Sequence, residues 1–182
     1  YLVPNILARH LPLVMTRFLA RIGGYWFVYG YYATMLLVPA FIVWLICLLQ
    51  PFGLTLAWWH DVFAVLYGRG MLLVIPMLLF IGARRARHPI VRSVQLTTTK
   101  PIERDFSVAF ASDIHLGAVL GAPFARKLRD DLMALQPDLV LLGGDLIDGN
   151  LEYVLWDKSF SGFDGLKAPW GVYAVFGNHD TY

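Results

Sequence analysis

The chain has 182 residues, of which 58% are hydrophobic and only 15% are charged, and its formal net charge is +2. This composition excludes an ordinary soluble single domain. The charge is also divided, because residues 1–92 carry a net charge of +7 and residues 93–182 a net charge of −5. We therefore expect two environments, a membrane region with basic flanks followed by a soluble, mildly acidic domain.

The membrane region begins with residues 1–21, in which apolar side chains are mixed with arginines, a histidine and two prolines. This pattern favours a basic segment at the membrane interface over a membrane span. Residues 25–49 are 25 almost entirely apolar or aromatic residues without a formal charge. About 20 apolar residues suffice to cross the hydrocarbon core, so this stretch predicts a transmembrane helix. Pro39 is expected to kink that helix.

A second apolar stretch follows a predicted turn at residues 50–53. It consists of the two runs 54–67 and 70–83, which are separated by Gly68-Arg69-Gly70. One interpretation is a single return span over about residues 61–83, and the other is two short or re-entrant pieces. We favour the single span, because one arginine can extend to the interface or face the interior of a helix bundle.

Arginines gather on both sides of these apolar stretches. Because basic residues accumulate on the cytoplasmic side of membranes, both flanks are expected there. The sequence thus predicts an integral protein of a bacterial inner membrane whose following domain is cytoplasmic. The arginines concerned are Arg9, Arg17 and Arg21 on one side, and Arg84, Arg85, Arg87 and Arg92 on the other.

The pattern changes to α/β after a polar linker at residues 93–105. Apolar runs typical of buried strands occupy residues 106–111, 138–142 and 171–176. Between the first two lies a predicted helix at 123–135, with a proline in its first turn, and residues 151–166 combine a helix with a loop. This alternation predicts a parallel sheet in a domain that covers residues 106–182.

Each predicted strand is followed by a short polar string. The strings are Asp113-Ile114-His115, Gly144-Asp145-Leu146-Ile147-Asp148 and Gly177-Asn178-His179-Asp180. Ligands of open α/β sheets collect beyond the carboxyl ends of the strands, so the three strings are expected to meet in one cleft. A mixture of carboxylate, amide and imidazole ligands suits divalent ions such as Mn, Fe or Zn better than a pure Ca or Mg site.

In this order, D-x-H, G-D-x-x-D and G-N-H-D resemble the first three signature blocks of the calcineurin-like metallophosphoesterases. The resemblance covers about residues 104–182. It implies a phosphoesterase with a binuclear metal centre, and a four-layer sandwich of which this chain contains the first half. The later histidine blocks of the family do not occur before Tyr182, so we expect the chain to be a fragment of a longer protein.

The resemblance also implies roles for individual residues. Asp113 and His115 correspond to ligands of the first metal ion, and Asp145 to the carboxylate that bridges both ions. Asn178 corresponds to a ligand of the second ion. His179 corresponds to the catalytic histidine that approaches the phosphate and protonates the leaving oxygen.

Asp148 and Asp180 correspond to carboxylates that orient the ligands and histidines. A simpler interpretation stays open for both. Asp148 could only begin the turn Asp148-Gly149-Asn150, and Asp180 could be a turn or cap residue.

Two functions follow. The first is a membrane-anchored, metal-dependent phosphoesterase that hydrolyses a phosphomonoester, phosphodiester or pyrophosphate, with a lipid-linked substrate favoured by the tether. The alternative is a non-catalytic membrane protein with an incomplete phosphoesterase-like interaction module. No nucleic-acid partner is expected, because no aromatic residues interleave the charged residues 126–131.

Overall fold

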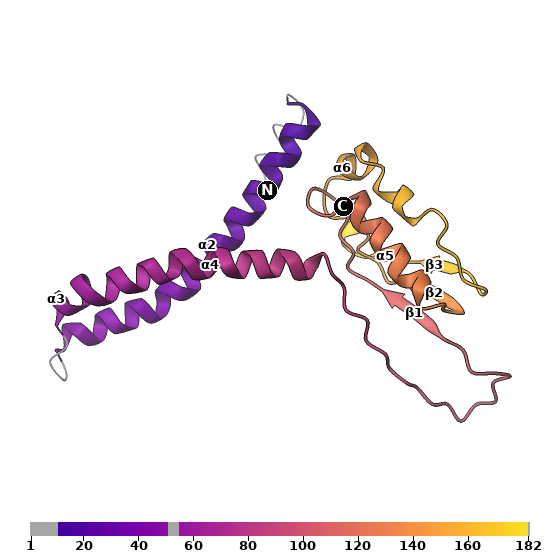
Figure 1. Cartoon of the computed structure of the whole chain (residues 1–182), viewed down its shortest axis with the longest axis horizontal. Coiled ribbons are helices and arrows are strands. Elements are labelled where there is room, and N and C mark those ends of the chain that lie inside the picture. The colour runs from indigo at the N-terminus through magenta and orange to yellow at the C-terminus, as the bar shows by residue number, and fades with distance from the viewer. Residues whose placement is uncertain (1–10, 51–54, 182) are drawn as a thin grey trace. The chain divides into compact units, whose positions relative to one another are not determined.

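The computed structural model describes residues 11–50 and 55–181. It separates into two compact units (Figure 1). One unit comprises the described residues up to Arg21 together with those from Pro89 onward, and the other comprises Ile22–His88. Arg9 and residues 51–53 of the predicted turn lie outside the described residues.

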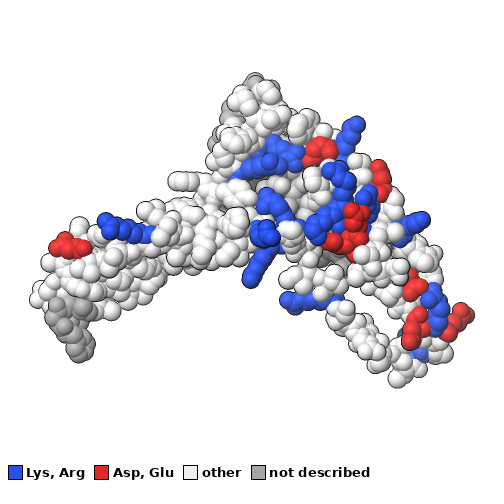
Figure 2. Space-filling view, in the orientation of Figure 1, with Lys and Arg blue, Asp and Glu red and all other residues white. Residues whose placement is uncertain are grey.

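Two long apolar helices dominate the first half of the chain. Helix α2 covers Leu13–Leu48 and includes Pro39. The second helix is continuous over Leu56–Ala86, and it consists of α3 (Leu56–Trp58), a π-helical turn (Trp59–Phe63) and α4 (Ala64–Ala86). Both are long and apolar enough to cross a membrane. On the face shown in Figure 2, the arm formed by the two long helices is mostly white, with a few charged side chains.

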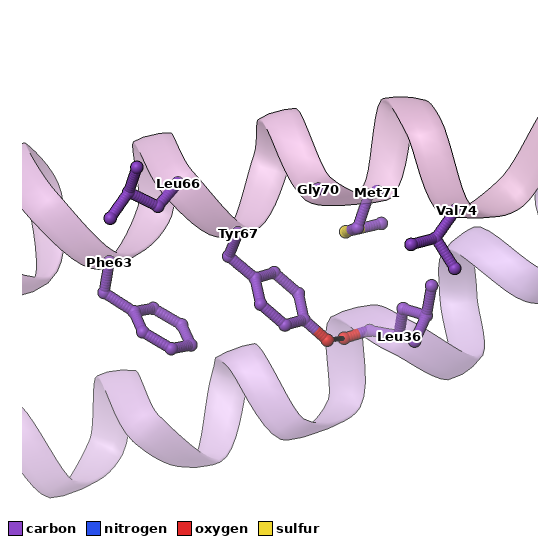
Figure 3. A pocket seen from close by; sticks show the side chains of 7 residues that line it. All are labelled: Leu36, Phe63, Leu66, Tyr67, Gly70, Met71 and Val74. Carbon is purple, nitrogen blue, oxygen red and sulfur yellow. Dashed lines mark hydrogen bonds between the residues drawn. The ribbon is translucent and has the colours of Figure 1, made fainter.

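The second helix runs without a break through Gly68-Arg69-Gly70, where the sequence left two arrangements open. It meets α2 near Pro39. There the Tyr67 hydroxyl donates a hydrogen bond of 2.6 Å to the Leu36 carbonyl, beside an apolar groove of about 400 Å³ (Figure 3). This hydrogen bond joins the second helix to the main chain of α2.

The α/β part contains a parallel three-stranded sheet of order β1-β2-β3. The strands are β1 (Val108–Ala111), β2 (Leu139–Leu142) and β3 (Val172–Ala174). Helix α5 (Ala122–Ala134) connects the first two strands. Helix α6 (Leu151–Trp156) and a 3₁₀ helix (Ser159–Phe163) precede the third. The predicted fold class, apolar helices followed by a parallel α/β region, is therefore confirmed.

One face of the sheet packs against α5. Leu128 and Leu132 of the helix are buried with Val140 of the central strand, whereas Leu135, just after the helix, is 45% exposed. On the other face Phe110 is 65% exposed and Tyr173 is 61% exposed. A second sheet is not among the described residues, so the four-layer sandwich stays an expectation.

Candidate metal site

The three polar strings occupy the loops that follow the three strands. The first two loops are joined along their backbones, because the His115 N–H donates to the Asp145 carbonyl at 2.9 Å. The Asp148 N–H donates in turn to the Leu116 carbonyl at 2.8 Å. Main-chain hydrogen bonds therefore fix the D-x-H string against the G-D-x-x-D string.

Two glycines allow the second and third loops to approach each other. Gly144 has a φ of +90°, and a Cβ atom there would lie 2.7 Å from the backbone nitrogen of Gly177. A Cβ atom at Gly177 would collide with the carboxylate of Asp145. Any side chain at either position would separate the loops, so the glycines of these two strings are required for the site to assemble.

Three residues of the site have left-handed backbone conformations. The φ angles of Asp113, His115 and Asp145 are 56°, 51° and 52°. Such angles are uncommon outside glycine, and clusters of them are found at ligand-binding and catalytic sites, where the surrounding structure maintains the strain. The strain here coincides with the residues for which metal binding was predicted.

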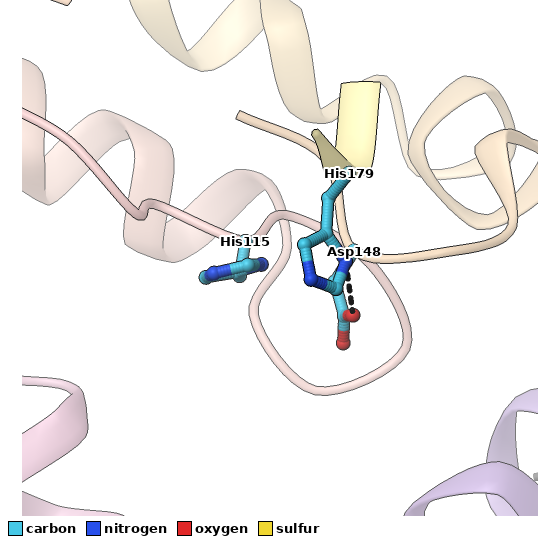
Figure 4. A group of neighbouring side chains, drawn as sticks. All are labelled: His115, Asp148 and His179. Carbon is cyan, nitrogen blue, oxygen red and sulfur yellow. Dashed lines mark ion pairs between the residues drawn. The ribbon is translucent and has the colours of Figure 1, made fainter. Parts of the chain in front are cut away.

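The side chains form two groups of potential metal ligands that share His115. One group contains Asp113, His115 and Asp145, and the other contains His115, Asp148 and His179. Within each group the ligand atoms lie within 4.8 Å of one another. Figure 4 shows the second group, in which the rings of His115 and His179 are 4.9 Å apart and nearly perpendicular. Carboxylate and imidazole donors fit divalent first-row transition ions.

His179 has two links to the loop that follows β2. Its Nδ1 atom lies 3.9 Å from the Asp148 carboxylate, and its backbone N–H donates to Asp145 Oδ1 at 2.9 Å. Asp148 therefore lies beside a histidine and among potential ligands, in addition to standing at the start of a turn. Its spacing, three residues after Asp145 on the same loop, was the sequence signal for this position.

Asn178 and Asp180 differ in their surroundings. Asn178 is exposed, and its backbone carbonyl accepts a hydrogen bond from the Thr181 hydroxyl at 3.0 Å. The Asp180 carboxylate instead accepts hydrogen bonds from the backbone N–H groups of Ile147 and Gly177. Burial opposes ionisation of Asp180, but these and neighbouring backbone amides hold the pKa of its carboxyl below the usual value.

A strand-end cluster of carboxylates and imidazoles is an arrangement typical of metal-dependent hydrolases. Residues 106–182 match the model of the calcineurin-like phosphoesterase family. The α/β domain therefore resembles the calcineurin-like metallophosphoesterases, and the match covers less than half of the chain.

Relatives from bacteria and animals agree with this assignment. A metallophosphoesterase of Helicobacter pylori is 33% identical over 82 residues, which is 44% of this chain and 21% of the relative. One of Aquifex aeolicus is 30% identical over 47% of this chain and 32% of the relative. The bovine "Transmembrane protein with metallophosphoesterase domain" is 28% identical over 53% of this chain and 22% of the relative. The matches thus span at most about a third of these relatives, and no solved structure matches the chain significantly.

Proposed function

We propose that the protein is a membrane-anchored, metal-dependent phosphoesterase that hydrolyses a phosphomonoester, phosphodiester or pyrophosphate. The observation that carries this proposal is the assembly of Asp113, His115 and Asp145 at the carboxyl ends of parallel strands. All three have strained backbones, and their ligand atoms lie within 4.8 Å of one another. A folded domain that served only as an interaction module would have no need to maintain such strain around these donors.

Two divalent ions in such a site would act as Lewis acids that stabilise the attacking and the leaving oxygens of the phosphoryl transfer. Asp113 and His115 would hold the first ion. Asp145 would contribute to both positions, and Asn178 would contribute to the second from the neighbouring loop. The third loop is held close to Asp145, because the His179 N–H donates to that carboxylate.

His179 would act on the substrate itself. Its imidazole belongs to the second ligand group but is 45% exposed, so a phosphate group can reach it. Asp148, 3.9 Å from Nδ1, would orient the ring. A protonated His179 could then donate its proton to the leaving oxygen as the bond to phosphorus breaks.

The two apolar helices support the membrane anchor. Only 11% and 6% of their most apolar windows are buried, whereas the core helix of a soluble protein would be mostly buried. The bovine relative is also named as a transmembrane protein. A catalytic domain on the same chain as such helices favours a lipid-linked substrate, and the arginines after α4 favour the cytoplasmic face of a bacterial inner membrane.

The test is an assay of the full-length protein, purified in detergent. After chelation and dialysis, hydrolysis of an aryl phosphodiester is measured with and without added Mn²⁺. We expect activity that requires the metal and is lost in Asp145→Asn. The matched control is Asp130→Asn, because the Asp130 side chain is a carboxylate that is 66% exposed on α5. Metal-independent activity, or equal activity in Asp145→Asn, would contradict the proposal.

A further inference from the structure

Arg17, near the start of α2, is nearly buried in the compact unit that also contains the metal site, with only 9% of its surface exposed. Its Nη2 atom forms an ion pair of 2.7 Å with the Asp157 carboxylate. The same guanidinium donates to two backbone carbonyls, from Nε to Ala118 at 3.1 Å and from Nη2 to Gly117 at 3.2 Å. A membrane-flank arginine would instead be expected to face solvent or lipid headgroups.

The surroundings of Arg17 complete a polar site. Its guanidinium lies 5.6 Å from the centre of the Trp156 ring. Asp157 also accepts a short hydrogen bond from the hydroxyl of Ser159, which is fully buried. A buried charge is tolerated only when it is paired and hydrogen-bonded, and both conditions are met here. Gly121 packs directly against this ion pair, because a Cβ atom at Gly121 would collide with the Asp157 carboxylate.

The two carbonyls that Arg17 binds belong to the loop that carries His115. Two N–H groups of this loop have main-chain partners. The His115 N–H donates to the Asp145 carbonyl, and the Gly117 N–H closes a turn by donating to the Leu120 carbonyl at 2.7 Å. The carbonyls of Gly117 and Ala118 accept hydrogen bonds from Arg17, and the Ala118 carbonyl also accepts one from Arg21 at 2.6 Å. The loop after His115 is therefore held between the β2 loop and the first helix.

We propose that Arg17 is a positioning residue of the metal site. By fixing the carbonyls of Gly117 and Ala118, it determines where His115 lies. The start of α2 would then help to position a metal ligand of the α/β domain. This inference rests on the proposed function for the role of His115. It does not require that the substrate be known.

Two substitutions separate positioning from mere stability. Arginine presents several donors in a rigid fork, whereas lysine presents one compact ammonium group. Arg17→Lys can keep the ion pair with Asp157 but loses the fork to the two carbonyls. Asp157→Asn removes the ion pair, but the amide oxygen of the new side chain can still accept a hydrogen bond from Arg17. In this variant Arg17 is expected to keep its hydrogen bonds to the carbonyls of Gly117 and Ala118. Arg126→Ala is the control, because Arg126 is an exposed arginine on α5.

The experiment measures three quantities for the intact protein in detergent: the thermal unfolding midpoint, amide hydrogen exchange of a peptide covering residues 113–121, and Mn²⁺ affinity. For Arg17→Lys we expect a nearly unchanged midpoint, faster exchange in this peptide and Mn²⁺ binding weakened by about tenfold, as for other residues that orient ligands. For Asp157→Asn we expect a lower midpoint with the native Mn²⁺ affinity. The control should match the unchanged protein in all three.

Unchanged exchange and Mn²⁺ affinity in Arg17→Lys would overturn the inference. The inference would also fail if both variants had a lower unfolding midpoint and a proportionally weaker Mn²⁺ affinity. Arg17 would then contribute only to stability. The outcome is separable from that of the proposed function. If the unchanged protein hydrolyses no phosphoester but the exchange and affinity respond as expected, the proposed function fails and the positioning role stands.

Discussion

The carboxylate of Asp180 accepts hydrogen bonds from the backbone N–H groups of Ile147 and Gly177, at 2.9 and 2.8 Å. One side chain thereby joins the loop that follows β2 to the loop that follows β3. These loops carry Asp145 and His179, so their relative position decides whether the two side chains can act on one substrate.

Asp180→Ala should therefore destabilise the domain. Hydrogen bonds to charged groups contribute about 1.5–3 kcal/mol each, so we expect the free energy of unfolding to fall by about 2 kcal/mol or more. Chemical denaturation followed by tryptophan fluorescence measures this. Asp105→Ala, in the exposed segment before β1, is the matched control. An equal effect of both substitutions would show that Asp180 does not join the loops.

His179→Ala should lower turnover more than it lowers metal affinity. General acid catalysis contributes about 10²–10⁴-fold to a rate, and this is the loss expected in kcat. Asp148→Asn should cause a smaller loss of kcat, because the histidine remains but loses its orienting carboxylate. Mn²⁺ content and kcat are measured on the same preparations. A parallel loss of metal and activity in His179→Ala would make this residue a ligand instead.

The link between Asp138 and the segment before β1 should depend on pH. Asp138 accepts hydrogen bonds from the Ser107 N–H at 2.8 Å and from Arg104 at 2.7 Å, and these hold the pKa of its carboxyl below the usual 3.8. Because the pKa is lower in the folded state, this stabilisation is fully present above about pH 4 and is lost as the pH falls through the folded value.

The measurement compares urea midpoints of the unchanged protein and Asp138→Asn between pH 7 and pH 3. We expect a constant difference near neutral pH that shrinks in acid. A difference that stays constant down to pH 3 would show that the ionised carboxylate contributes nothing.

The predicted topology places residue 93 on the cytoplasmic side. An even number of spans joins two basic flanks, so a cysteine at Ser93 should be protected from an impermeant thiol reagent in intact cells. Ser93→Cys is made in a Cys47→Ser background, because Cys47 is the only native cysteine. Labelling should appear only after permeabilisation. Labelling of intact cells would put the domain outside.

The sequence predicted the α/β elements well because their apolar runs end at polar strings. Helix α5 begins at Ala122 and ends at Ala134, within one residue of the predicted helix at each end. Strand β3 is shorter than predicted, because Val175 and Phe176 already belong to the loop that approaches Asp145. Loop geometry of this kind depends on tertiary contacts that no local pattern contains.

The part that could not be predicted is the environment of Arg17. A basic residue before an apolar stretch is normally a membrane-flank charge, and nothing in its neighbourhood indicates Asp157, 140 residues away in the chain. The left-handed conformations of Asp113 and His115 were likewise hidden, since neither residue type requires a positive φ. Both features arise only when distant segments pack together.

The central claim is that Asp113, His115 and Asp145 hold catalytic metal. Anomalous diffraction from crystals grown with Mn²⁺ tests it most directly. The account predicts two peaks about 3.5–4 Å apart, the separation typical of binuclear phosphoesterase sites, with the first peak bound by His115 and Asp113. The Asp145→Asn variant should lose at least one of these peaks. Well-ordered crystals without a peak at the carboxyl ends of the strands, or with Mn²⁺ bound only elsewhere, would contradict the account.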